Sequence, residues 1–444
     1  MKTLHATPVP SAPAALPSAA RLASILDCGP KGARRNRKLP PPLALALFLQ
    51  QCLDRNLSLR AVLSAYGSEL PGRDRPGESA YCQARSRLSL EQIACASASV
   101  ASRFERVAPA FLKGRLLLAL DAADFTVEDT AANRAVWTYP SGQKEGCGFP
   151  VLSALFSLVL DTGEMRTLNL GKWSTHDLRL ALEAPAPFEA GAIHVGDRIF
   201  GTFVFAALCR LADGDAIGRV KAGLHLVRNR SKRLGPGSWL VEMKRPEASR
   251  ILSPEQLAAL PETLAVRLVH AKIEIRGHRT EDLWVVTTLL DPVEDPDDEI
   301  LLAYGMRWDI ELAFRDVKTS MGASFLRTKT PEMAEKAVRV FLLARNLVRL
   351  ILSSTRLETG EKKLSFKTAL PVVANILWQL VAGGNLRRLV AARIHVLQSL
   401  LYKRRKRPSQ PRAGKLRKQR FPYLTAPRGE YIEIPHIKKY RKGA

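Results

Sequence analysis

Four side chains that could act on a phosphodiester recur at helical spacing late in the chain: Tyr304, Arg307, Glu311 and Lys318. At about 100° per residue, they leave one α-helix within a wedge of roughly 60°. A carboxylate flanked by two cations and a phenol is a poor choice for a buried core, because charged groups lose their hydration there. It suits a site that holds a metal ion against a phosphodiester. The alternative is a solvated helix face.

The remaining faces of this helix support a packed element. Ile310, Phe314 and Val317 fall together on one side of the stripe, whereas Asp309 and Asp316 fall on the opposite side. An apolar face of this kind is typical of a helix that packs on a core. The pattern therefore predicts a helix over residues 301–322 that presents its stripe to a site.

Two further carboxylates come at the ends of predicted strands. Asp121 closes the first strand of the central region, and Asp197 closes the fourth. Asp124 competes with Asp121, but we expect it in the turn that follows the strand. With Glu311, the two aspartates would form a set of three oxygen ligands for two Mg²⁺ ions, with Mn²⁺ as a substitute.

The elements around these residues predict how they are positioned. The order from residue 115 is three strands, helix, strand, helix, strand. The expected strands are 115–121, 149–160, 165–170, 192–197 and 216–221, and the expected helices are 176–183 and 200–211. This order matches a ribonuclease-H-like α/β fold, with an antiparallel start joined to parallel strands. Its first and fourth strands are neighbours, so Asp121 and Asp197 would meet.

Composition changes along the chain predict six regions. They are a flexible leader (1–40), a helical DNA-binding domain (41–112), the ribonuclease-H-like catalytic core (113–222 and 297–330), a β-rich insertion subdomain that interrupts it (223–296), a helical C-terminal region (331–402) and a basic tail (403–444). The fold class is thus α/β with helical additions at both ends.

The net charge of the chain predicts the class of molecule that it binds. The net charge of +26 at pH 7 indicates a polyanion, and nucleic acid is the commonest one. Arg85 and Arg87 on the helix of residues 79–90 could bind DNA in a helix-turn-helix-like arrangement; the alternative is an ordinary helical cap. Arg219 and Lys221, at the end of the fifth strand, could add phosphate contacts, as could the basic run 403–407.

Several sequence patterns that are absent exclude other classes of protein. The six cysteines form no CxxC pair, so neither a zinc finger nor a disulfide framework is expected, and a reducing cytoplasm is the expected compartment. We expect no membrane association, because no apolar stretch is long enough to span a bilayer. A phosphate-binding loop ending in GK[ST] does not occur, so ATP use is not indicated. His194 and His176 are expected to be structural.

The spaced stripe, Y-x2-R-x3-E-x6-K, resembles the YREK signature of bacterial insertion-sequence transposases of the DDE type (the IS-four family). The surrounding YGMRWDIELAFRDVK is similar to the YxxRWxIExxFxxxK pattern of that family, and AYCQARSRLS is similar to an N-terminal stretch of its members. The resemblance covers residues 40–400. LDAADF departs from the more usual Asp-Gly-Thr at the first aspartate, which leaves Asp124 open as an alternative to Asp121.

The resemblance implies roles. Asp121, Asp197 and Glu311 would be the catalytic metal ligands, and the other three members of the stripe would contact phosphates near the transposon end. A Trp of the insertion would stack on a base flipped out of the duplex. Trp284 holds the comparable place and Trp239 is the second choice; the alternative for Trp284 is a position in a small core.

The function implied is a transposase that binds the terminal inverted repeats of its insertion sequence and catalyses Mg²⁺-dependent cleavage and strand transfer. Its partners would be double-stranded DNA, at the transposon ends and at the target, and a second protomer in a synaptic homodimer. It would act in the bacterial cytoplasm at the nucleoid. One alternative is a catalytically inactive, domesticated DNA-binding protein, and another is a ribonuclease-H-like nuclease or resolvase.

Overall fold

The computed structural model describes residues 39–69, 76–141, 147–220, 231–273, 281–359, 364–381, 430–434 and 439–442. The chain divides into two units, and each is described by itself. One unit comprises residues 1–105 and 347–403, and the other comprises residues 106–346 and 404–444. Among the described helices, none is both long enough and apolar enough to cross a membrane.

The first unit is helical, as its apolar runs predict. Its elements are α2 (Pro41–Leu53), α3 (Leu59–Glu69), α4 (Glu78–Arg87), α5 (Leu90–Ala101), the end of α12 (Pro331–Thr359) and α13 (Phe366–Val381). α2 lies against α3, α4 and α13, which explains why its residues 44–53 are all buried. A capping box starts α5, in which the Ser89 hydroxyl accepts the backbone N–H of Gln92 and the Gln92 side chain accepts that of Ser89.

Arg85 does not lie on the surface, where the predicted contact with DNA requires it. Its side chain is buried at the α2–α4 contact, where Nη1 donates a 3.0 Å hydrogen bond to Oε1 of Gln51 and the guanidinium lies 4.8 Å from the ring centre of Phe48. Arg85 therefore holds the helical unit together, because α4 turns this side toward α2. Arg87, two residues on, is exposed.

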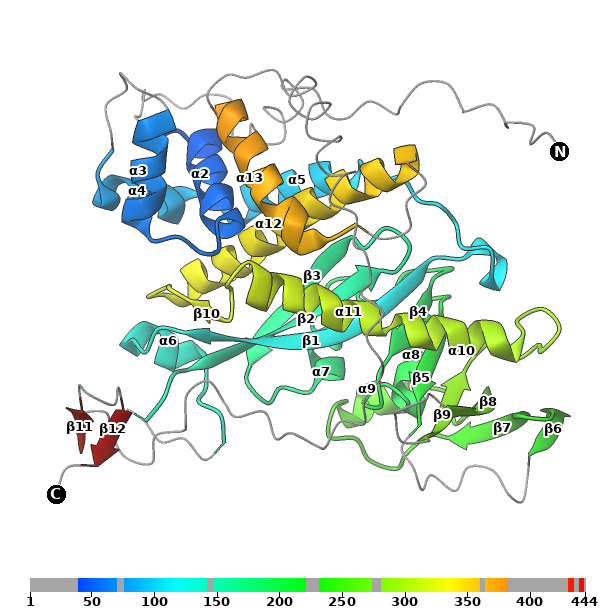
Figure 1. The fold of residues 1–444 in the computed structure, drawn as a ribbon. Coiled ribbons are helices and arrows are strands. Elements are labelled where there is room, and N and C mark those ends of the chain that lie inside the picture. The colour runs from blue at the N-terminus through cyan, green and yellow to red at the C-terminus, as the bar shows by residue number, and fades with distance from the viewer. Residues whose placement is uncertain are drawn as a thin grey trace, which may run out of the picture. The chain divides into compact units, whose positions relative to one another are not determined.

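The second unit carries the predicted order of elements around a large sheet (Figure 1). Its strands are β1 (Leu117–Val127), β2 (Val151–Val159), β3 (Met165–Lys172), β4 (Ile193–Gly196), β5 (Asp215–Arg219), β6 (Lys232–Gly235), β7 (Ser238–Lys244), β8 (Thr263–Ile273), β9 (Glu281–Thr287) and β10 (Phe325–Leu326). Its helices are α6 (Ala131–Val136), α7 (Asp177–Leu182), α8 (Phe203–Leu211), α9 (Pro254–Ala258), α10 (Asp297–Met306), α11 (Trp308–Arg315) and the start of α12. The short strands β11 (Tyr431–Ile434) and β12 (Lys439–Lys442) pair with each other.

The sheet is mixed and runs in the order β3-β2-β1-β4-β5-β9-β8-β7-β6, with β10 beside β1. β2 and β3 are antiparallel to their neighbours, whereas β4 and β5 run parallel to β1. The segment predicted as a β-rich insertion adds its strands to the same sheet, because β9 pairs antiparallel with β5. The unit is therefore a mixed α/β structure built on one large sheet.

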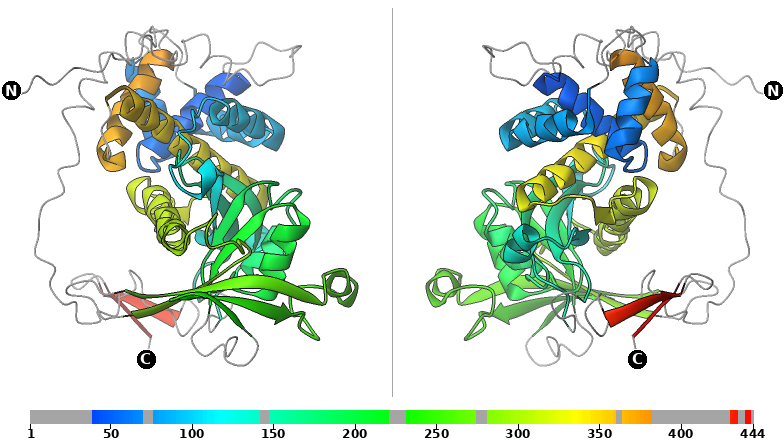
Figure 2. Two further views of the ribbon diagram at one scale, coloured as in Figure 1. Left: turned by 90° about the vertical axis from the view of Figure 1, so that its right-hand side faces the viewer. Right: turned by 90° about the vertical axis from the view of Figure 1, so that its left-hand side faces the viewer.

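Helices cover both faces of this sheet. The two views of Figure 2 show α10 and α11 on one face and α7 and α8 on the other. Side chains of β1 alternate between these layers: Leu120 packs with the residues of α8, whereas the Phe125 ring meets Phe156, which in turn meets Phe314 of α11. Asp121, two and four residues from Ala123 and Phe125, shares their face.

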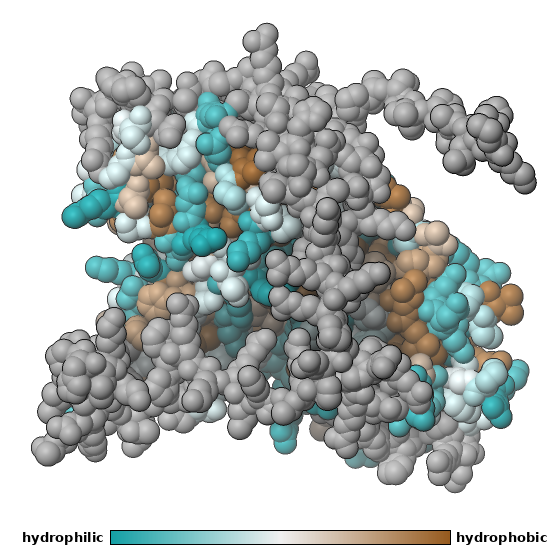
Figure 3. All heavy atoms as spheres, viewed as in Figure 1, coloured by the Kyte–Doolittle hydropathy of each residue, from teal (hydrophilic) through white to brown (hydrophobic). Residues whose placement is uncertain are grey.

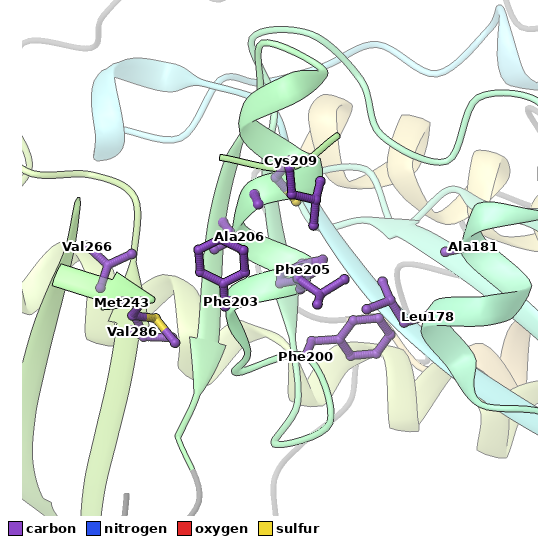
Figure 4. Packing of buried hydrophobic residues seen from close by; sticks show 14 of the residues in the cluster. Leu178, Ala181, Phe200, Phe203, Phe205, Ala206, Cys209, Met243, Val266 and Val286 are labelled. Atoms are coloured by element: carbon purple, nitrogen blue, oxygen red, sulfur yellow. The ribbon is translucent and has the colours of Figure 1, made fainter. Parts of the chain in front are cut away.

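An aromatic core anchors α8 under β4 and β5. Phe200, Phe203 and Phe205 are buried with Leu178 of α7 and with Val286 of β9 (Figure 4). The ring centres of Phe200 and Phe205 are 5.1 Å apart in an edge-to-face arrangement. This core holds the β4–α8 connection, which carries Asp197.

A glycine allows that connection to lie directly on β5. A Cβ atom on Gly201 would stand 1.8 Å from the carbonyl oxygen of Arg219, an overlap with backbone that no rotamer relieves. We expect Gly201→Ala to lower the free energy of unfolding by on the order of 3 kcal/mol, measured by urea denaturation. Gly305→Ala is the control, since nothing lies within 4 Å of its added Cβ and helical alanine is favoured. Equal stability of the two variants would refute this reading.

Buried ion pairs tie the start of α10 to the sheet. Arg115, just before β1, pairs with Asp215 of β5 at 2.9 Å and with Asp295 at 3.1 Å. Arg267 of β8, fully buried, donates to the backbone carbonyl of Asp295. Because Asp295 lies two residues before α10, these contacts fix where that helix begins on the sheet.

His194 of β4 is structural, as expected. It is fully buried, its Nε2 accepts the backbone N–H of Glu189 at 3.0 Å, and its Nδ1 lies 3.3 Å from the carbonyl oxygen of Asp215. Burial lowers its pKa to about 4. His176, also expected to be structural, caps the N-terminus of α7 by accepting the backbone N–H of Leu178.

The low pKa of His194 predicts a pH dependence of stability. Since its pKa lies near 4 when folded and near 6.5 when unfolded, the unfolded chain binds more protons between these values, and stability is lost as pH falls through this window. The loss reaches about 3 kcal/mol at most. Urea denaturation from pH 7.5 to 4.5 should show a shallower decline for His194→Gln than for wild type or for His176→Gln. The prediction would be contradicted if the free energy of unfolding declined equally with pH in all three proteins.

The described surface mixes polar and apolar residues, with apolar ones gathered over α10 and the loop before it (Figure 3). Val293 and Leu302 are 84% and 52% exposed there, and Trp308 at the start of α11 is 57% exposed.

Candidate active site

Two carboxylates lie side by side, Asp121 within β1 and Asp197 one residue after the end of the neighbouring parallel strand β4. The register pairs Leu120 of β1 with Gly196 of β4, so the next residues along each strand are Asp121 and Asp197. Asp121 accepts the backbone N–H of Ala122 at 2.9 Å, and Oδ1 of Asp197 accepts that of Ile199 at 2.7 Å. The sheet therefore brings these two aspartates together.

The prediction that the first strand ends at Asp121 and that Asp124 lies in the following turn is wrong. β1 does not end at Asp121 but continues to Val127, because it pairs with β2 as far as Thr126 and then with β10. Asp124 is thus also a strand residue, and its carboxylate accepts the hydroxyl of Ser153 on β2. Asp121 is distinguished instead by its neighbours, Asp197 and Arg307.

Burial and neighbouring carboxylates raise the pKa values of two aspartates at this site. Burial, reinforced by the charge of Asp197, raises the pKa of Asp121 to about 7, against the opposing effect of Arg307. Asp177, at the start of α7, has its pKa raised to about 6 by burial, then by Asp197 and Asp124. Sequence reasoning missed Asp177, since no motif spacing links a helix-start acid to strands that come before and after it.

The predicted helix of the stripe exists, with two local changes. α10 and α11 follow each other through Arg307, whose backbone stays helical (φ −49°, ψ −32°). A π-turn, Asp316–Ser320, continues α11 and carries Lys318, so the uniform 100° spacing does not extend to this residue. The predicted apolar side is confirmed, since Ile310 and Val317 are buried.

Arg307 joins the helix to the sheet. Its Nη2 donates to Oε1 of Glu311 at 2.9 Å, and its Nη1 lies 3.7 Å from Oδ2 of Asp121. The guanidinium lies 5.9 Å from the ring centre of Tyr304. Only 12% of the Arg307 side chain is exposed. The Arg307 guanidinium therefore lies close to two other members of the stripe, Tyr304 and Glu311, and to Asp121.

Lys318 completes the stripe from the π-turn. Its ammonium group lies 5.5 Å from the ring centre of Phe125. Burial lowers the pKa of Lys318, while Asp124 and Asp121 oppose this shift. Burial raises the pKa of Tyr304, and the charges of Arg307 and Arg219 act in the opposite direction. The stripe, the end of β5 and the two strand aspartates therefore share one electrostatic environment.

The chemical types of the side chains at this site suit a divalent metal ion. Asp121 and Asp197 are oxygen ligands suited to hard cations. However, among the described residues no three acidic, histidine or cysteine side chains are grouped closely enough to hold an ion. Arg307, not a third carboxylate, contacts Asp121.

Arg219 and Lys221 are the basic residues predicted to contact DNA at the end of the fifth strand. Arg219 ends β5 and acts on Tyr304, so it lies at the site. Lys221 lies outside the described residues.

Trp284 of β9 lies at the same end of the sheet, where its carbonyl accepts the backbone N–H of Val220 after β5. The imidazole of His270 stacks on its ring with centres 4.2 Å apart, and the Trp239 ring is tilted toward it at 5.7 Å. Trp284 and Trp239 also pack against the buried core that contains Val286. The geometry accommodates a core role for Trp284, and stacking on a base stays a prediction.

The chain is similar to known transposases. A family model described as "Transposase DDE domain" matches residues 112–347. Transposase InsG for insertion sequence element IS4, of Escherichia coli (strain K12), is 24% identical over 404 residues, which are 89% of each chain. Among solved structures, the cryo-EM structure of the piggyBac transposase synaptic complex with hairpin DNA matches with a TM-score of 0.41 and 12% identity, over 88% of this chain and 83% of that chain.

The family model spans more than half of the chain and includes both strand aspartates and the whole stripe. The chain therefore belongs to the DDE transposase family and is a transposase enzyme.

Proposed function

We propose that this transposase binds the terminal inverted repeats of its insertion sequence and catalyses divalent-metal-dependent DNA cleavage and strand transfer. The observation that carries the proposal is the meeting of Asp121 and Asp197 on adjacent strands, with Arg307 of the stripe contacting Asp121 and Glu311. β1 to β5 and the helices between them then form a ribonuclease-H-like core, and β6 to β9 form an insertion before the catalytic helix.

In this proposal Asp121, Asp197 and Glu311 hold the metal, Mg²⁺ or in its place Mn²⁺. The metal, when bound, supplies activation of the attacking oxygen and stabilisation of the leaving oxygen. The protein holds these carboxylates on rigid elements and excludes part of the solvent around Asp121. The half-buried cations Arg307 and Lys318, with the Tyr304 hydroxyl, orient phosphate oxygens of the scissile strand.

Double-stranded DNA is the proposed partner, at both the transposon end and the target. Arg219, Lys221 and the exposed Arg87 add phosphate contacts, and Trp284 receives an unpaired base. Two protomers then hold two ends in a synaptic homodimer. The helical unit, of which α2 to α5 form part, is the proposed DNA-binding domain.

The test uses a duplex that spans the junction between the gene's flanking DNA and its inverted repeat. We expect cleavage at that junction with Mg²⁺ or Mn²⁺ and none with EDTA. Gel shifts against excess unrelated duplex separate end recognition from binding driven by the charge of +26. Retention of end binding without cleavage under any divalent ion would instead support an inactive, domesticated DNA-binding protein. Cleavage of any duplex without end preference would support a nuclease.

A further inference from the structure

Arg307 already pairs with two of the carboxylates that a metal would use, Glu311 and Asp121. One guanidinium nitrogen is 2.9 Å from Glu311 and another is 3.7 Å from Asp121, and the side chain is 12% exposed. A planar guanidinium presents several donors at fixed angles and can therefore contact two carboxylates at once. A divalent cation and this guanidinium compete for the same oxygens, and their like charges repel each other.

One donor of the same guanidinium lacks an acceptor. Nε of Arg307 is buried and has no hydrogen-bond partner among the described residues. A buried donor without a partner is costly, so an acceptor that satisfies it stabilises the arginine in a new position. Phosphate oxygens are strong acceptors for the guanidinium fork. Tyr304 lies beside the guanidinium and Arg219 acts on Tyr304, so this position has groups that favour an anion.

We propose that Arg307 is a latch that couples the binding of DNA to the binding of the divalent metal. Without DNA, Arg307 stays paired with Glu311 and Asp121. A DNA phosphate draws the guanidinium away and frees both carboxylates for the cation. The inference rests on the proposed function for the identity of the phosphate, but the latch itself is a property of the protein without DNA.

Reciprocal linkage makes the latch measurable. If phosphate binding releases the carboxylates, DNA tightens metal binding by the same factor by which the metal tightens DNA binding. We expect a factor of at least about 10 in wild type, equivalent to about 1.4 kcal/mol. The latch would limit metal loading on the free enzyme.

The experiment measures the dissociation constant of Mn²⁺ by electron paramagnetic resonance, without DNA and with a pre-cleaved duplex end that cannot be cut again. For Arg307→Gln without DNA we expect Mn²⁺ to bind at least about tenfold more tightly than in wild type. We also expect the tightening caused by the duplex to be smaller than in wild type by a similar factor.

Arg315→Gln is the matched control, because it removes the same charge from an exposed position on the same helix. Its Mn²⁺ affinity without DNA should stay within about threefold of wild type. The latch is refuted if Arg307→Gln and Arg315→Gln bind Mn²⁺ equally, or if the duplex leaves the wild-type affinity unchanged, a comparison that needs no folded variant. Failure of cleavage alone would count against the proposed function and not against the latch, since the measurement without DNA requires no reaction.

Discussion

Glu311→Gln is expected to abolish strand cleavage while DNA-end binding survives. Glutamine keeps the size of the side chain and a hydrogen-bond acceptor for Arg307, but it removes the negative charge that a divalent ion requires. We expect the cleavage rate to fall at least about a thousandfold, as when a group that stabilises transition-state charge is lost. Single-turnover cleavage of the labelled junction duplex, beside a gel shift on the same DNA, measures both quantities.

Asp309→Asn is the matched control for Glu311→Gln. Asp309 is an exposed acid on the same helix, away from the stripe, so its loss changes the net charge equally without touching the site. It should cleave within about threefold of wild type, as is usual for surface substitutions. Wild-type cleavage by Glu311→Gln would remove Glu311 from the proposed ligand set.

Asp121→Asn is expected to lose cleavage to a similar extent and, unusually, to stabilise the metal-free fold. The folded pKa of Asp121 is about 7, above the ordinary 3.8. A group of this kind contributes stability below the unfolded pKa and loses that contribution as pH rises through the folded value. At pH 8 the buried charge therefore costs up to about 4 kcal/mol, which a neutral side chain avoids.

Urea denaturation in EDTA tests this expectation. At pH 8, Asp121→Asn should exceed wild type by roughly 2 to 4 kcal/mol, and the gain should vanish near pH 4, where both side chains are neutral. Mn²⁺ should stabilise wild type and not the variant, because the variant lacks the ligand. Asp124→Asn is the control and should bring no gain, since the Asp124 carboxylate accepts the hydroxyl of Ser153. An unstabilised Asp121→Asn protein at pH 8 would overturn the electrostatic account.

Much of the site was readable from local pattern. Strand order follows from apolar runs separated by turn residues, and the packed side of the catalytic helix follows from the spacing of Ile310 and Val317, both of which are buried. The YREK spacing was sufficient to indicate the family that the comparison then showed. These features depend on neighbours in sequence, so the residues alone specify them.

Errors arose where distant segments meet. The length of β1 depends on its pairing with β2 and β10, which no residue near Asp121 signals, and so Asp124 was misplaced in a turn. The burial of Arg85 depends on α2, which supplies Gln51 as its partner. The stacking of His270 on Trp284 depends on the register of β8 and β9.

The residue types and their spacing thus determined which groups can act and on which kinds of element they stand, because propensity and periodicity are local properties. Only the tertiary structure decided that β1 continues past Asp121 to Val127, that a π-turn carries Lys318 and that Arg307 pairs with Glu311 and Asp121. Those outcomes depend on burial and on charges brought together across the sheet, and the free energies of such contacts belong to pairs of segments rather than to either segment alone.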